Sequence, residues 1–153
     1  MNSSLLFFVQ GIPEMAGFTA LSLALAGVPL RWGRIVAIGL FLAVVIFLIR
    51  SLPFAFGLHM IAGALLAVVI IAKGTSVSLP KSFLVVFVSG IILAFLEWII
   101  HESLFALIRL NLQTVLENEL LWTLLGLPQA VILLLLAVLI ARFRKSVPDK
   151  WRI

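Results

Sequence analysis

Apolar residues in this chain form five long runs separated by short polar breaks. The runs cover about residues 4–25, 34–49, 54–72, 82–108 and 120–141. A membrane-spanning helix needs about 20 residues, with a usual range of about 17–25. Runs such as "VILLLLAVLI" do not alternate between apolar and polar residues as the strands of a membrane β-barrel do. Because a backbone in lipid must satisfy its own hydrogen bonds, the pattern predicts an all-α integral membrane protein with five transmembrane helices.

The polar breaks between these runs are short, so we expect no large extramembrane domain. The pattern predicts a transmembrane domain over residues 1–145 and a basic tail over residues 146–153. The N-terminus, "MNSSLLFFVQGIPEM", lacks a basic region and a small-residue cleavage pattern, which favours a retained span over a signal peptide. The break "RLNLQTVLENEL" predicts either a short amphipathic helix lying on the outer surface or an ordinary polar loop.

Composition agrees with a lipid environment. Hydrophobic residues make up 64% of the chain and charged residues 11%, whereas soluble domains have about 25% charged residues. The chain contains no cysteine. Disulfides, thiolate metal sites and a cysteine nucleophile are therefore excluded, and we expect no cofactor.

The net charge of +5 indicates membrane topology and not nucleic-acid binding, because the aromatic residues lie inside the apolar runs. Only two bases, Arg50 and Arg109, fall on one side of a five-span chain. Nine fall on the other: Arg31, Arg34, Lys73, Lys81, Arg142, Arg144, Lys145, Lys150 and Arg152. The positive-inside rule places these nine in the cytoplasm. We therefore expect an outside N-terminus and a cytoplasmic C-terminus in a bacterial plasma membrane, with the bases touching anionic lipid headgroups.

Polar side chains inside the predicted spans gather in the outer half. At about 1.5 Å per residue, Glu14 lies ~15 Å deep, with Gln10 one turn above it and Gln129 at a similar depth. His59 and Glu97 lie nearer the outer interface. Since a charged group in hydrocarbon is costly unless paired or hydrated, we expect an outward-facing ligand pocket lined by Glu14, Arg50, His59, Glu97, His101 and Gln129.

Several readings of these residues stay open. Arg50, His101 and Glu102 also fit simple interface residues near water, and His59 fits a neutral imidazole bonded to a backbone carbonyl. Glu97 and His101 are spaced i, i+4 and share a helix face. Together with His59 they are the candidate metal ligands. The spacing is weaker than His-Glu-x-x-His, so we expect no enzyme; an intramembrane metal-dependent enzyme is the minor alternative.

Two functions compete for such a pocket. The first is a sensory or regulatory module that signals through its fifth helix and basic tail to a cytoplasmic kinase or regulator. The alternative is a small oligomeric transporter or channel subunit, although the inner halves of the helices lack ionisable groups. Pro13, Pro53, Pro128 and Gly126 are expected to break or loosen helices in the outer half. Small residues in "GFTALSLALAG" predict either homo-oligomer contacts or packing within one subunit.

Two stretches, "IRSLPFAFGLHM" at residues 49–60 and "LLGLPQAVILLLLAVLIARF" at residues 124–143, carry a resemblance. With the order of the five spans, they resemble the N-terminal membrane domains of clostridial receptor histidine kinases of the agr quorum-sensing type. The resemblance covers essentially the whole chain and implies a membrane sensor that feeds a GHKL-type kinase domain. The chain ends at "FRKSVPDKWRI" without a phosphoacceptor histidine segment, an Asn-containing ATP motif or a glycine-rich lid. Kinase activity is therefore not implied, and the resemblance assigns no binding residue.

Overall fold

The computed structural model of the 153-residue chain describes residues 3–53, 57–109, 111–144 and 150–152. In this part the chain is helical and contains no strand, which confirms the all-α prediction. The helices are α1 (Ser3–Leu25), α2 (Trp32–Arg50), α3 (Leu58–Gly74), α4 (Leu79–Ile108), α5 (Leu112–Glu117) and α6 (Glu119–Phe143). The short α5 resolves the two readings of the fourth break in favour of a helix.

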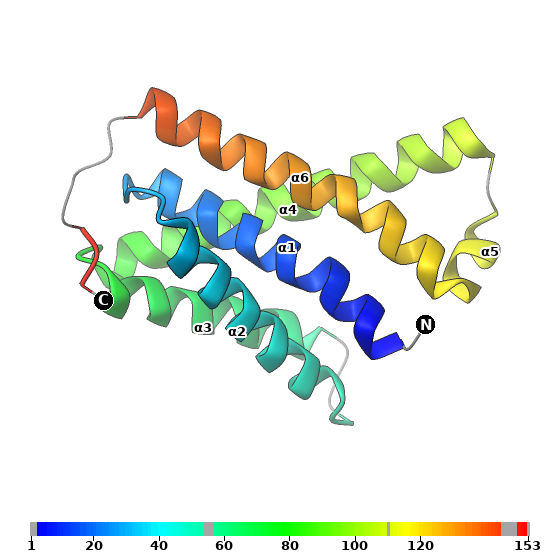
Figure 1. Cartoon of the computed structure of the whole chain (residues 1–153), viewed down its shortest axis with the longest axis horizontal. Coiled ribbons are helices and arrows are strands. Elements are labelled where there is room, and N and C mark those ends of the chain that lie inside the picture. Colours follow the sequence, from blue (N-terminus) through cyan, green and yellow to red (C-terminus); the bar gives the residue numbers. More distant parts are fainter. Residues whose placement is uncertain (1–2, 54–56, 110, 145–149, 153) are drawn as a thin grey trace.

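Helix α1 lies at the centre of the bundle. It packs most extensively against α6 and α2, and also contacts α4. Helix α3 packs against α4 and α2, and α5 against α6. Figure 1 shows α6 and α2 on opposite sides of α1, with α4 behind it. Any change in the position of α1 would therefore alter its contacts with three other long helices, α2, α4 and α6.

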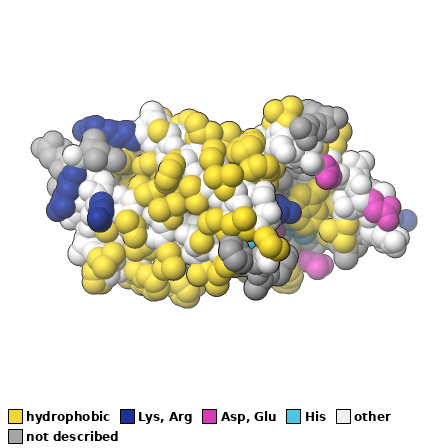
Figure 2. All heavy atoms as spheres, turned by 90° about the horizontal axis from the view of Figure 1, so that it is seen from below, with side chains coloured by type: hydrophobic (Ala, Val, Ile, Leu, Met, Phe, Trp, Pro, Cys, Tyr) yellow, Lys and Arg dark blue, Asp and Glu magenta, His cyan; other side chains and the backbone are white. Residues whose placement is uncertain are grey.

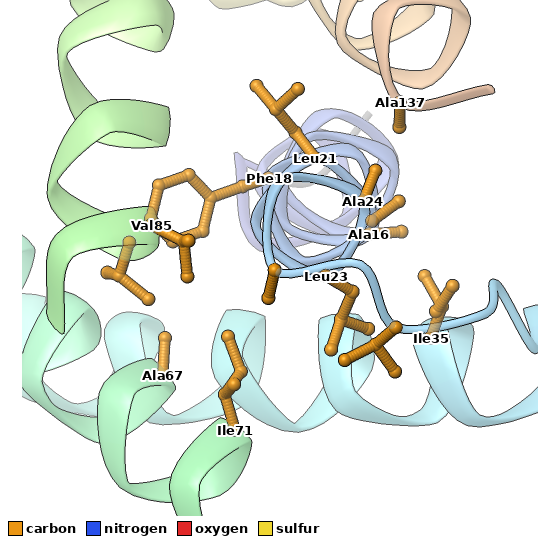
Figure 3. Close-up of a cluster of buried hydrophobic side chains, with 14 of the residues drawn as sticks. Ala16, Phe18, Leu21, Leu23, Ala24, Ile35, Ala67, Ile71, Val85 and Ala137 are labelled. Carbon is orange, nitrogen blue, oxygen red and sulfur yellow. The ribbon is translucent and has the colours of Figure 1, made fainter. Parts of the chain in front are cut away.

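Small residues allow α1 to take this central position. A Cβ atom added at Gly17 would lie 2.9 Å from Leu133 Cβ of α6, and one at Gly39 of α2 would lie 2.7 Å from the backbone nitrogen of Ala16. Ala20 is fully buried, and Ala137 of α6 points towards α1 (Figure 3). The small residues of "GFTALSLALAG" thus pack within one chain.

Two glycines lie at helix ends, and two prolines lie inside helices without breaking them. Gly27 and Gly57 have φ angles of 75° and 89°, in the left-handed region that glycine adopts without strain, and they follow α1 and precede α3. Helix α3 therefore begins at Leu58, and residues 54–56 of the third apolar run lie outside the described residues. Pro13 and Pro128 do not break their helices, since α1 and α6 continue through both.

Among the described residues, four helices are long and apolar enough to cross a membrane: α1, α2, α4 and α6. Helix α3 is apolar but has 17 residues, or ~25 Å at about 1.5 Å per residue, which is less than the ~30 Å hydrocarbon core. Helix α4 has 30 residues and a length of ~45 Å. The described residues therefore form a bundle in which four helices are long enough to span a membrane.

The two ends of the bundle carry opposite charge. We call the end at which α1, α3 and α6 finish the basic end, and the opposite one the acidic end. Figure 2 shows Lys and Arg side chains gathered at the basic end, Asp and Glu side chains at the other, and a broad hydrophobic surface between them. Exposed apolar side chains such as Phe87, Phe95 and Leu135 make up this surface, as expected for helices in contact with lipid.

The end of the chain folds back onto the basic end, which the sequence pattern did not predict. Trp151 forms an isolated antiparallel bridge with Thr75. Ser76 N donates to the Lys150 carbonyl oxygen at 2.7 Å, and Arg152 N donates to the Gly74 carbonyl oxygen at 2.8 Å. We call residues 150–152 the strap. The predicted boundary at residues 145 and 146, and with it Lys145, lies outside the described residues.

Candidate functional site

Two polar side chains of α1 begin the site. Gln10 Nε2 donates to Glu14 Oε2 at 3.4 Å, one turn further along the same helix face. Gln10 lies directly against Gly126 of α6, where an added Cβ atom would come within 2.2 Å of Gln10 Nε2. The absence of a side chain at Gly126 therefore makes room for the Gln10 amide between α1 and α6.

Helix α4 contributes Glu97. Its carboxylate is close enough to the Glu14 carboxylate for the two charges to interact, and both side chains are half-buried. The two carboxyl groups thus belong to helices that pack against each other, α1 and α4. Because like charges repel, a site that includes both carboxylates favours a positively charged ligand.

Helix α6 contributes Gln129, which is 2% exposed. It lies three residues beyond Gly126, so both face the interior on the side where α6 packs against α1 and α4. An amide offers two donors and two acceptor positions. Gln10, Glu14 and Glu97 are half-buried and Gln129 is buried, on three helices that pack against one another. We call these four side chains the polar group below.

His101 lies beside this group in a different arrangement from the expected one. Its Nδ1 contacts the backbone carbonyl oxygen of Glu97 at 2.6 Å, and not the Glu97 carboxylate. The ring lies 5.0 Å from Trp122 and 6.0 Å from Phe105, measured between centroids. Its Nε2 is buried and has no hydrogen-bond partner among the described residues. Glu97 and His101 therefore share a helix face, but the imidazole of His101 contacts the Glu97 backbone and not its side chain.

The remaining predicted pocket residues are not drawn into the polar group. Arg50 is exposed at the end of α2, with its guanidinium carbon 5.8 Å from the centre of the Phe7 ring. His59 is half-buried on α3, which packs against α2 and α4 and not extensively against α1. Glu102 is exposed, as an interfacial carboxylate would be.

A metal site is not assembled from the candidate ligands. Within the described part of the chain, no group of three or more His, Asp or Glu side chains lies close enough to hold a metal ion. His59, Glu97 and His101 therefore do not form a metal-binding set.

The structure adds a groove at the acidic end that the sequence reading missed. It has a volume of about 550 Å³ and is lined by Leu6, Thr114, Glu117, Asn118, Glu119 and Leu120. Asn118 caps α6, accepting a hydrogen bond from Leu121 N at 3.2 Å, and Asn111 caps α5 in the same way. The two Asn residues in "NLQTVLENEL" are a helix-cap signal that could have located this turn.

The bundle is closed on the basic side of the polar group. Leu21, Leu23 and Ala20 of α1 are fully buried there, and Figure 3 shows apolar side chains of the neighbouring helices around them. The Ser22 and Ser89 hydroxyl groups, 3.0 Å apart, bond to each other inside this core. The described interior on this side of the polar group is thus mainly apolar.

Comparisons with known proteins leave the resemblance to agr-type sensor domains untested. A scan against protein-family models, a search of curated proteins and a search of solved structures each found no match to the chain.

Proposed function

We propose that the chain is a membrane-embedded sensory or regulatory module with five spans, an outside N-terminus and a cytoplasmic basic end. In this proposal α3 completes its short span with its polar flanks, and the excess of bases at the basic end sets the orientation. The chain is not an enzyme in this proposal. The resemblance to agr-type sensor domains is consistent with it.

The polar group is the proposed ligand site. It combines two carboxyl groups and two amides from three helices. Gln10 lies one turn after Leu6, which lines the groove at the acidic end. We keep Gln10, Glu14, Glu97, His101 and Gln129 as ligand-site residues. Arg50 and His59 are left at its margin, for the packing reasons given above. The excess of acids favours a ligand with a positive charge.

The observation that carries the proposal is that α1 connects this site to the strap. Glu14 lies eleven residues before Leu25 on one continuous helix, a distance of ~16 Å. At the far end of α1, Arg144 donates to the Leu25 carbonyl oxygen, and Lys150 Nζ donates to the Ala26 carbonyl oxygen at 3.1 Å. A shift of α1 against α6 at Glu14 would therefore reach the strap without any intermediate element.

A transporter or channel subunit is the alternative function. The buried Ser22–Ser89 pair extends the line of polar groups beyond Glu14 and favours this function. However, the two hydroxyl groups satisfy each other and are surrounded by apolar residues. Flux of a monovalent cation through proteoliposomes, lost in Glu14→Gln, would support transport. Absence of flux for the wild type leaves sensing as the function.

A labelling experiment tests the proposed topology. The chain has no native cysteine, so single cysteines at Ser3 and Arg152, both exposed, can be labelled without background. A membrane-impermeant maleimide applied to intact cells should label Ser3→Cys and spare Arg152→Cys. Labelling of both positions would indicate an even number of spans. Labelling of Arg152→Cys alone would reverse the orientation. Either result would refute the proposed arrangement.

A further inference from the structure

Basic side chains from several elements meet around the end of α1. Arg144, directly after α6, and Lys150 of the strap donate to the neighbouring carbonyl oxygens of Leu25 and Ala26. Lys81 of α4 is near enough to act on Lys150 electrostatically. Desolvation, followed by the charges of Lys81 and Arg144, lowers the pKa of Lys150 below its ordinary value. Positive charge is thus concentrated in one small region.

Arg34 of α2 adds an unsatisfied donor to this region. Its guanidinium carbon lies 5.3 Å from the centre of the Trp151 ring, next to Lys150. Its Nη1 is buried and has no hydrogen-bond partner among the described residues. A buried donor without an acceptor destabilises the folded chain. The region therefore has more donors than the nearby protein groups satisfy.

Acidic side chains that could neutralise these bases lie elsewhere. The chain has six acidic residues. Glu14 lies in the middle of α1, and Glu97 and Glu102 lie in the second half of α4, away from the basic end. Glu117 ends α5 and Glu119 begins α6, at the acidic end. The sixth, Asp149, lies outside the described residues. The chemistry of the region is thus suited to an anion that does not come from the described part of the chain.

An apolar groove opens beside Arg144. It has a volume of about 350 Å³ and is lined by Leu139, Ile140, Phe143 and Arg144. It runs along the part of α6 that faces away from the core, where Leu139 is half exposed and Phe143 is 84% exposed. A free inorganic anion would make no favourable contact with this apolar surface, whereas a lipid acyl chain would cover it.

We propose that the basic end binds one anionic phospholipid molecule. The headgroup phosphate accepts hydrogen bonds from Arg34, Arg144 and Lys150, and one acyl chain lies along Leu139, Ile140 and Phe143. Arginine forms short, charge-assisted bonds with phosphate, and tryptophan is favoured at the membrane interface, where Trp151 would lie beside the headgroup. Because the same residues hold the strap, lipid binding stabilises the docked strap. This inference is independent of the ligand site at the acidic end.

Native mass spectrometry of the full chain in neutral detergent tests the proposal. Phosphatidylglycerol should bind as a single molecule in preference to phosphatidylcholine. Arg34→Gln should weaken this binding about fivefold, since each base near the headgroup contributes about 1 kcal/mol. Arg109→Gln is the matched control, because Arg109 is an exposed base after α4 at the acidic end. Arg144→Gln provides a second variant at an exposed helix end if Arg34→Gln does not fold.

Three outcomes would overturn the proposal. The first is equal retention of phosphatidylglycerol and phosphatidylcholine. The second is the same loss of binding in Arg109→Gln as in Arg34→Gln and Arg144→Gln. The third is displacement of phosphatidylglycerol by inorganic phosphate at equal concentration, which would show that the region takes a free anion and that the α6 groove has no part in binding.

Discussion

Ser22 of α1 and Ser89 of α4 join two helices through a hydrogen bond of 3.0 Å between their hydroxyl groups, in a region where both side chains are fully buried. Ser22 Oγ also lies 2.9 Å from the Phe18 carbonyl oxygen of its own helix. Because a hydroxyl group has a single hydrogen, donating it to this carbonyl leaves Ser22 Oγ to accept the hydrogen of Ser89, which ties α4 to the central helix. Along α1, Ser22 lies between Glu14 of the polar group and the end of the helix, where the strap docks.

A double-mutant cycle measures this link. Ser22→Ala and Ser89→Ala should each destabilise the bundle, with a coupling energy of about 0.6 kcal/mol, the average for such bonds between membrane helices. Ser82→Ala is the control, because the Ser82 hydroxyl group, also buried, bonds to the Ser78 carbonyl oxygen one turn away. Unfolding in detergent provides the free energies. Equal coupling of Ser22 with Ser82 and with Ser89 would show that the bond is not specific.

The contact between α1 and α2 predicts a large effect at Gly39. A methyl group there would meet the Ala16 backbone, with its nitrogen at 2.7 Å and Cα at 2.9 Å, and backbone atoms cannot move aside cheaply. Gly39→Ala should therefore lower the unfolding free energy by about 1–3 kcal/mol. Gly90→Ala in α4 is the matched control, since an added Cβ meets nothing within 4 Å. It should be neutral, or stabilising by up to about 1 kcal/mol. Comparable losses in both variants would contradict this packing.

Gln10 and Gly126 should depend on each other. A methyl group at Gly126 would collide with the Gln10 amide, 2.2 Å away, and so displace it from Glu14. Because the collision requires the amide, Gly126→Ala should cost less stability in a Gln10→Ala background than in the wild type. We expect a coupling energy of about 1 kcal/mol, as for other directly contacting residues. Thermal unfolding of the two single variants and the double variant measures it, and strictly additive effects would argue against the contact.

The strap should respond to pH through Lys150. Its pKa is lowered in the folded chain, so the folded state binds fewer protons than the unfolded state between the lowered pKa and the ordinary value of about 10.4. Stability therefore rises with pH across this window. The difference in unfolding midpoint between the wild type and Lys150→Gln should shift in favour of the wild type from pH 7.5 to pH 10. A constant difference would mean that Lys150 has its ordinary pKa.

Much of the fold follows from apolar periodicity, because lipid leaves a backbone few choices. The runs at residues 4–25 and 120–141 match α1 and α6 to within about two residues at each end. The start of α3 was missed because the positive φ angle of Gly57 depends on a turn that no hydrophobic pattern records. The docking of Trp151 on Pro29, with a hydrogen bond of 2.7 Å from Nε1 to the carbonyl oxygen, is a long-range contact and equally invisible in the sequence.

The candidate site was predictable in part for a similar reason. The energetic penalty of a charge in lipid indicates that Glu14 and Glu97 each need a polar partner, and Glu14 does accept a hydrogen bond from Gln10. It does not indicate which helices are neighbours. His59 was included because of its depth alone, whereas the packing of α3 against α2 and α4 keeps it apart from α1. The place of Gln10 in the site depends on Gly126, because the lack of a side chain at Gly126 leaves space for the Gln10 amide.

The most direct test of the account asks whether the polar group and the strap are coupled through α1. Spin labels on Arg31→Cys and Arg152→Cys, introduced into the cysteine-free chain, report the docked strap as a distance distribution measured by pulsed electron resonance. Glu14→Gln combined with Glu97→Gln should lower the docked population, while Glu102→Gln, an exposed carboxylate on α4, should leave it unchanged. Identical distributions in the wild type and both variants would contradict the coupling on which the proposed sensory function rests.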